Sequence, residues 1–131
     1  MRLLLDTHIA LWAVIDEKRL TASARVLIEN PDNDVFVSAA SVWEIAIKHA
    51  LRRGGGRTMP ISGAAALRHF RVSGYQMVDI SPADAAAVDT LPAHHADPFD
   101  RMLVAQALTA PFRLLTHDAR VARYSASIIR V

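Results

Sequence analysis

Short apolar runs alternate with helix-like stretches along the chain. The first run, Leu3–Leu5, has no polar face, which is typical of a strand covered on both sides in a parallel sheet. It ends abruptly on the carboxylate of Asp6. Further strand-like runs are Val35–Val37, Gln76–Ile80, Arg113–Thr116 and Ile128–Val131.

Helical patterns fill the segments between these runs, and most begin at a residue suited to capping a helix. The predicted helices are Thr7–Ile15, one capped by Thr21, one from Ser38 to about Arg53, Ser62–Val72, one from Ser81 to Leu91, and one from Asp97 to Ala110. Alternating strands and helices predict an α/β fold with a mainly parallel sheet and helices on both faces.

Length and composition narrow the class of protein. The chain has 131 residues, so we expect one domain, residues 1–131. It has no cysteine, which excludes disulfide frameworks, thiolate zinc sites and cysteine nucleophiles. No apolar run has the roughly 20 residues of a membrane span, and no signal-peptide core follows Met1. We expect a cytoplasmic protein without a membrane partner.

The net charge of +2 hides an uneven distribution. The segment from Ile45 to Val78 contains no acid, and it holds Lys48, Arg52, Arg53, Arg57, Arg68 and Arg71. One end of the molecule is therefore expected to be basic and another acidic. The alternative is that these arginines only solvate helix faces.

Acidic residues recur where a strand gives way to a helix. Asp6 and Asp118 follow predicted strands, Glu44 lies in the second turn of its helix, and Asp97 and Asp100 begin another. In a parallel sheet these positions share one edge. Clustered carboxylates repel one another unless a cation neutralises them, and hard oxygen ligands suit Mg²⁺ or Mn²⁺.

Each acid also has an ordinary structural explanation. Asp6, Asp97 and Asp118 are suitable helix N-caps. Glu44 lies one turn before Lys48, the favourable order for a surface ion pair. The hypothesis of a metal site therefore rests on their coincidence at one edge.

Four motifs carry a resemblance to a known family. Leu3–His8, Ser41–Ile45, His95–Ala107 and Leu115–Asp118 resemble, in order and spacing, the acidic motifs of PIN-domain ribonucleases of the VapC-type toxin branch. The resemblance implies a PIN-like three-layer fold, with a five-stranded parallel sheet between helices. It also implies that Asp6, Glu44, Asp100 and Asp118 are the catalytic and metal-binding acids, with Asp97 and Thr116 as auxiliary residues.

The implied function is that of an endoribonuclease toxin. A water activated by Mg²⁺ or Mn²⁺ would hydrolyse RNA phosphodiesters. The implied partners are RNA and a VapB-type antitoxin of a type II toxin–antitoxin pair, and we also expect a homodimer. Trp12, Leu11 and Ile15 are candidate antitoxin anchors. Arg52, Arg53, Arg57, Arg68 and Arg71 are predicted to hold RNA.

Three alternatives use the same residues differently. His8, His94, His95 and His117 lie beside the acids and could act as general acid and base or bind zinc. A non-catalytic binding module would use the acids only as caps. A phosphoacceptor signalling domain would need a lysine after a late strand, and the lysines of this chain are Lys18 and Lys48.

Overall fold

A parallel sheet forms the centre of the computed structural model, which describes residues 1–51 and 59–131. Its strands run in the order β3-β2-β1-β4-β5, and every neighbouring pair is parallel. They are β1 (Arg2–Leu5), β2 (Asp34–Ser38), β3 (Gln76–Val78), β4 (Arg113–Thr116) and β5 (Ile129–Arg130). The predicted α/β class is confirmed.

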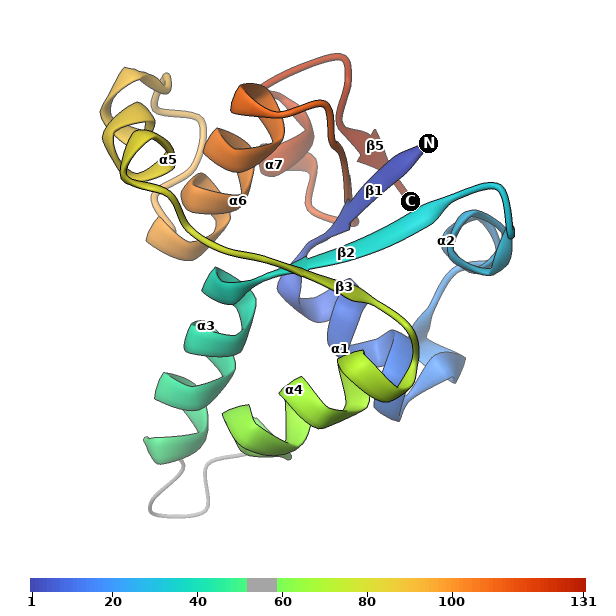
Figure 1. Cartoon of the computed structure of the whole chain (residues 1–131). Coiled ribbons are helices and arrows are strands. Elements are labelled where there is room, and N and C mark those ends of the chain that lie inside the picture. Colours follow the sequence, from blue (N-terminus) through green and yellow to red (C-terminus); the bar gives the residue numbers. More distant parts are fainter. Residues whose placement is uncertain (52–58) are drawn as a thin grey trace.

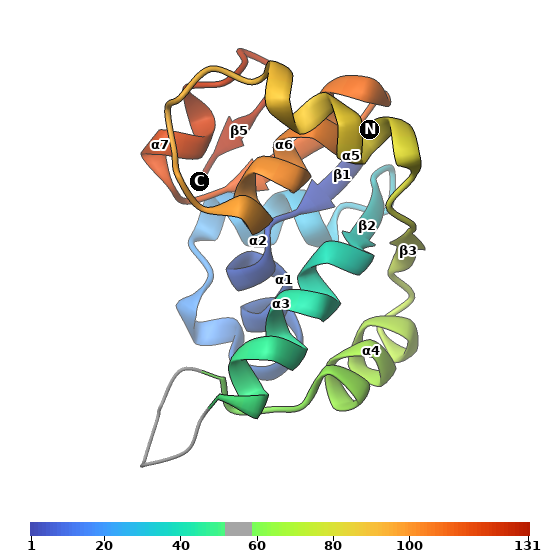
Figure 2. The same ribbon diagram turned by 90° about the vertical axis from the view of Figure 1, so that its left-hand side faces the viewer.

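Helices cover both faces of the sheet. They are α1 (Thr7–Ile15), α2 (Ala22–Glu29), α3 (Ala39–Ala50), α4 (Gly63–Val72), α5 (Pro82–Ala87), α6 (Pro98–Thr109) and α7 (Ala119–Ala122), with short 3₁₀ turns η1 (Glu17–Arg19) and η2 (Val88–Thr90). Figure 1 shows α5, α6 and α7 on one side of the sheet and α1 and α4 on the other. Figure 2, turned by 90°, shows the same three layers.

Strand β1 supplies both halves of the core. Leu3 and Leu5 pack with α1, α3 and α4 residues, whereas Leu4 packs with Leu103 and Val104 of α6 on the opposite face. All three leucines are fully buried. An unbroken apolar run is therefore what a central parallel strand requires, because its alternating side chains enter two separate cores.

Most predicted helix starts are confirmed. Asp6, Thr21, Ser38, Ser62, Ser81 and Asp97 each accept a backbone N–H at the start of a helix. The helix from Ser81 is broken, because η2 replaces its last turn. The predicted end of α3 near Arg53 lies outside the described residues.

Two predicted strands are shorter than expected. Strand β3 ends at Val78 rather than Ile80, because Val78 pairs with Ser38 and β2 gives way to α3 there. Strand β5 spans only Ile129–Arg130, although Val131 still donates to the Thr116 carbonyl at 2.8 Å. Both are edge strands, whose length is limited by their single partner.

The strand order determines where a site can form. The chain moves outward from β1 through β2 to β3, then returns to add β4 and β5 on the other side of β1. The order therefore reverses between β1 and β4, and in open α/β sheets ligands bind at the carboxyl edge of such a point. Among the described residues, no helix is long and apolar enough to cross a membrane.

Candidate metal centre at the carboxyl edge of the sheet

One cavity brings the predicted acids together. It has a volume of about 220 Å³, and we call it the acidic cavity. It is lined by Asp6, His8, Glu44, Lys48, His95, Asp97, Asp100, His117, Asp118 and Arg120. The prediction that five acids from distant parts of the chain meet at one edge is therefore confirmed; their roles there stay a prediction.

Asp6 is the most enclosed of these acids. It follows β1 directly, and its Oδ1 accepts the Ile9 N–H at 2.8 Å, which caps α1. Its Oδ2 accepts the Thr116 hydroxyl at 2.5 Å. Burial raises the pKa of Asp6, although the two hydrogen bonds act in the opposite direction. The predicted cap is therefore confirmed, and the same carboxylate also lines the acidic cavity.

Glu44 enters the cavity from α3 and is equally buried. Its Oε2 accepts a hydrogen bond from Lys48 Nζ at 2.6 Å, so the predicted i, i+4 pair is present. Partial burial of the lysine favours its neutral form, yet the bond to Glu44 raises the pKa of Lys48 overall. The other oxygen, Oε1, is buried and has no hydrogen-bond partner among the described residues. A buried carboxylate oxygen without a donor is unusual, and a cation bound beside Glu44 would satisfy it.

Asp100 lies at the start of α6, beside Asp97. Asp97 caps the helix by accepting the Asp100 N–H at 2.9 Å. Asp100 Oδ2 lies 2.7 Å from His95 Nε2. Burial, followed by the charges of the neighbouring acids, raises the pKa of Asp100 to about 6 despite the His95 contact. A carboxyl so perturbed among like charges is typical of functional sites.

Asp118 has the opposite electrostatic environment. Its Oδ1 accepts both the backbone N–H and the Nε–H of Arg120, and its Oδ2 accepts from the guanidinium at 2.9 Å. These hydrogen bonds lower the pKa of Asp118 to about 2. Its own N–H donates to the Thr116 hydroxyl at 3.0 Å. Thr116 therefore connects Asp6 with the Asp118 backbone.

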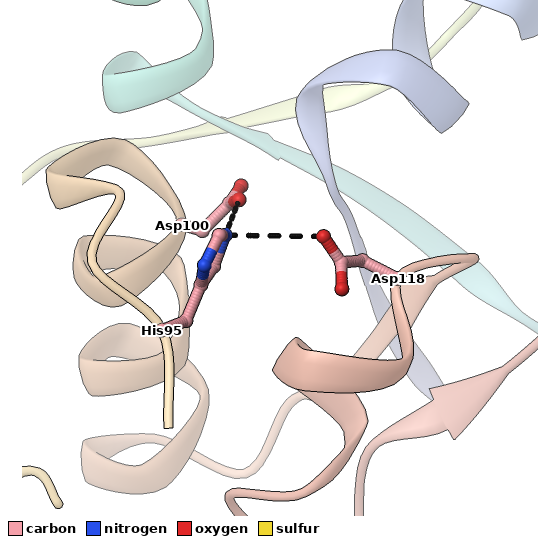
Figure 3. A group of neighbouring side chains, drawn as sticks. All are labelled: His95, Asp100 and Asp118. Carbon is pink, nitrogen blue, oxygen red and sulfur yellow. Dashed lines mark hydrogen bonds and ion pairs between the residues drawn. The ribbon is translucent and has the colours of Figure 1, made fainter. Parts of the chain in front are cut away.

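His95 lies between Asp100 and Asp118. Figure 3 shows its ring, carried by the segment before α6, between Asp100 and Asp118. Its Nε2 lies 3.8 Å from Asp118 Oδ2, and the ligand atoms of the three residues lie within 4.8 Å of one another. Asp6 and Glu44 line the same cavity without belonging to this group. The carboxylates thus share a cavity but do not all converge on one point.

The segment that carries His95 is held by two residues that the sequence analysis missed. The Arg101 guanidinium donates to the carbonyls of Val88 and Pro92 at 3.0 Å each. The Tyr124 hydroxyl accepts from Arg101 and from the His95 N–H, both at 3.0 Å. Arg101 follows Asp100 directly and was visible in the sequence, but no local pattern links Tyr124 to His95.

The other three histidines that the sequence analysis named as candidates lie in two different places. His8 and His117 line the acidic cavity, and their rings contact Trp12. His94 does not line it, and its ring instead packs edge to face on Tyr124 at 5.0 Å. The structure therefore places His8, His95 and His117 beside the acids and His94 outside.

Of the basic residues that the structure describes in the middle segment, Lys48 lines the acidic cavity and the arginines do not. Arg68 and Arg71 are exposed on α4, which leads into the start of β3 and hence towards the amino edge of the sheet. Neither lines the acidic cavity. The predicted RNA contacts of Arg52, Arg53 and Arg57 lie outside the described residues.

The donor set fits a hard divalent cation. Carboxylate oxygens dominate it, and Glu44 Oε1 has no donor among the described residues. The pKa of Asp100 is raised first by burial and then by the negative charges of the neighbouring acids. A bound cation would provide a partner for Glu44 Oε1 and would offset the negative charge around Asp100. His95 adds a nitrogen ligand that Mn²⁺ and zinc accept more readily than Mg²⁺ does.

Comparison with known proteins agrees with this architecture, a small α/β domain built around an acidic cavity. The family model of the PIN domain matches residues 3–126. Ribonuclease VapC22 of Mycobacterium tuberculosis (strain ATCC 25618 / H37Rv) is 33% identical over 120 residues, which cover 90% of this chain and 88% of that protein. The chain belongs to the PIN domain family, and the resemblance to VapC-type members is confirmed.

Two solved structures share the fold. VapBC2 from Rickettsia felis, bound to a DNA fragment from their promoter, matches with a TM-score of 0.69 at 15% identity, covering 100% of this chain and 98% of that chain. A toxin–antitoxin complex from Klebsiella pneumoniae matches with a TM-score of 0.58 at 19% identity, covering 97% and 95%. The predicted PIN-like three-layer fold is confirmed.

Proposed function

We propose that this protein is a Mg²⁺- or Mn²⁺-dependent endoribonuclease and the toxin of a toxin–antitoxin pair. The observation that carries the proposal is the acidic cavity, in which five carboxylates meet at the β1–β4 edge of a PIN domain. Ribonuclease VapC22, 33% identical to this chain, is named as a ribonuclease, which supports the proposed activity.

The residues present divide the work of the site. Asp6, Glu44, Asp100 and Asp118 would hold the cation, and Asp97 would add charge while capping α6. A bound divalent ion supplies an acidified water and positive charge at the phosphate. Thr116 orients Asp6 through its hydroxyl, and burial of Asp6 and Glu44 keeps bulk water from competing for their oxygens.

Cleavage assays on the purified chain test this proposal. We expect RNA hydrolysis in Mg²⁺ or Mn²⁺, its loss in EDTA, and 5′-phosphate products. Asp6→Asn, Glu44→Gln, Asp100→Asn and Asp118→Asn should each reduce the rate at least about 100-fold, since even outer-shell partners of metal ligands are worth 10–100-fold. If these acids were only caps, the variants would lose stability and keep activity, and that pattern would refute the site.

A histidine-based or zinc-dependent nuclease is the second candidate. The convergence of His95, Asp100 and Asp118 within 4.8 Å favours it, because zinc accepts both histidine nitrogen and carboxylate oxygen as ligands. Cyclic 2′,3′-phosphate products would support histidine catalysis, and activity with zinc alone would support the zinc enzyme. Absence of both metal binding and cleavage would leave a non-catalytic binding module.

An antitoxin partner would cover the surface beside the acidic cavity. A second cavity of about 220 Å³ is lined by His8, Leu11, Trp12, Ile15, Asp16, Arg19 and Pro60. It contains all three predicted anchors and shares His8 with the acidic cavity. A peptide seated there reaches the acids directly. Co-expression with a VapB-type protein encoded beside this gene should suppress toxicity, and Trp12→Ala should weaken the complex.

Two further parts of the proposal concern assembly and RNA. Trp43 is 57% exposed and packs edge to face on Phe99, so a second copy of the chain could cover this pair in a homodimer. Light scattering of the wild type and Trp43→Ser tests it. Arg68 and Arg71, which do not line the acidic cavity, would add phosphate contacts to the RNA substrate.

A further inference from the structure

Arg120 is an exposed cation among the described residues that line the acidic cavity. Its side chain is 62% exposed and lines two depressions at once. One is the acidic cavity. The other, which we call the neighbouring hollow, has a volume of about 330 Å³ and is formed with Ala93, His94, His95 and Ala96. Any ligand that extends from the acids into this hollow passes the guanidinium.

Both oxygens of Asp118 are engaged by this one side chain. Nε donates to Oδ1 at 3.2 Å and a terminal nitrogen donates to Oδ2 at 2.9 Å. A divalent cation bound to Asp118 would weaken this pairing, because the guanidinium and the ion are both positive, compete for the charge of one carboxylate and repel each other. The guanidinium would then be released at the cavity mouth.

The charge balance of the acidic cavity favours a role for the Arg120 guanidinium in binding phosphate. Five carboxylates line it, and Lys48 and Arg120 are the lysine and arginine among its lining residues. One divalent ion leaves the cavity short of neutrality, so an RNA phosphate is still repelled. Lys48 is held against the buried Glu44, whereas Arg120 is open to solvent. A planar guanidinium also matches two phosphate oxygens at once.

We propose that Arg120 is a phosphate-binding residue that exchanges partners. In the metal-free protein it holds Asp118; in the metal-bound protein it binds an RNA phosphate next to the one being cut, whose nucleotide lies in the neighbouring hollow. This inference rests on the proposed ribonuclease function. A purely structural role, stabilising the start of α7, is the competing explanation.

The Arg120→Ala variant separates these roles. The hydrogen bond that caps α7 runs from the Arg120 backbone N–H to Asp118 Oδ1 and does not involve the arginine side chain. The fold should therefore survive the substitution. Arg120→Lys keeps the charge without the planar fork. Arg123→Ala is the matched control, because Arg123 is an exposed arginine that follows the same helix and does not line either depression.

Calorimetry with Mn²⁺ alone tests the exchange. Arg120→Ala should bind Mn²⁺ more tightly than the wild type by a few-fold, because Asp118 no longer has a competing cation. Arg123→Ala should match the wild type. Unchanged or weaker Mn²⁺ binding in Arg120→Ala would overturn the exchange.

RNA binding tests the phosphate contact. With Mn²⁺ and single-stranded RNA made resistant to cleavage by phosphorothioate linkages, Arg120→Ala should weaken RNA binding about tenfold, as for one hydrogen bond to a charged group. It should also flatten the log–log salt dependence by roughly 0.7. Arg120→Lys should restore the slope but only part of the affinity. A slope equal to that of Arg123→Ala would overturn the proposal.

Steady-state kinetics in the active protein provide the second readout. Arg120→Ala should raise KM more than it lowers kcat. If the wild type cleaves RNA and Arg120→Ala has the same KM, this inference fails and the proposed function stands. If the wild type cleaves no RNA in any divalent metal, the proposed function fails.

Discussion

The acidic cavity has an inner and an outer half, and they are built differently. Asp6 and Glu44 of the inner half are 5% and 3% exposed; Asp6 directly follows β1, and Glu44 lies within α3. Asp100 and Asp118 of the outer half have side chains 24% and 23% exposed. Their partner His95 lies on an irregular segment that is held by side chains rather than by a ladder.

Similar exposure does not give the outer acids similar chemistry. The pKa of Asp100 is raised to about 6 and that of Asp118 is lowered to about 2, although both face His95. Burial, followed by the charges of the neighbouring acids, raises the pKa of Asp100, whereas the hydrogen bonds from Arg120 lower that of Asp118. The inner half is thus defined by the backbone fold, and the outer half by a few side-chain contacts that can be exchanged one at a time.

Among changes that leave the acids themselves intact, removing the Thr116 hydroxyl, which links the two halves, should reduce RNA cleavage most. Thr116→Val deletes the hydroxyl that donates to Asp6 and accepts from the Asp118 N–H. We expect RNA cleavage to fall about 10–100-fold, as for outer-shell partners of metal ligands. The free energy of unfolding should fall by about 2 kcal/mol, or about 8 °C in Tm. Thr116→Ser keeps the hydroxyl and should retain most of both; equal damage in the serine variant would show that the methyl group matters instead.

Loosening the outer half alone should have a smaller effect on cleavage. Arg101→Met removes the donors that hold the carbonyls of Val88 and Pro92 and the Tyr124 hydroxyl. Thermal melts should show a loss of about 1–3 kcal/mol from unsatisfied acceptors. Cleavage should fall about tenfold, because His95 and Asp100 lose their fixed geometry. Tyr124→Phe removes a single hydroxyl from the same network and should show a milder loss of both.

The raised pKa of Asp100 should appear as a pH dependence of the metal-free protein. Between about pH 4 and 6 the folded state holds more protons than the unfolded state, since the ordinary pKa of 3.8 is raised to about 6. Stability therefore falls as pH rises through this window. In EDTA, Tm should drop by a few degrees, since ~1 kcal/mol is about 4 °C here. Asp100→Asn should flatten the curve, and an identical slope in that variant would assign the trend to another group.

The arginines of α4 should have the smallest effect. If Arg68 and Arg71 each contact one phosphate, the double alanine variant should flatten the salt dependence of RNA binding by roughly 1.4, from ~0.7 per contact. The kcat should not change, because neither residue lines the acidic cavity. An unaltered slope would leave both as ordinary solvated residues of the helix surface.

The sequence by itself determined the elements and the positions of the acids. Apolar runs and capping residues act within a few positions of themselves, so strands and helix starts such as Ser38 and Ser81 could be predicted from local physics. The shared edge of Asp6, Glu44 and Asp118 followed from parallel topology. The assignment to a family came from motif order and spacing.

Only the tertiary structure decided which groups touch. The Thr116–Asp6 hydrogen bond joins residues 110 positions apart, and the Tyr124–His95 contact joins residues 29 apart. Such contacts depend on strand order and on rotamers, which no local periodicity encodes. The same holds for Asp100 and Asp118: both are helix-start aspartates in the sequence, and their opposite pKa shifts arise from what the fold places beside them.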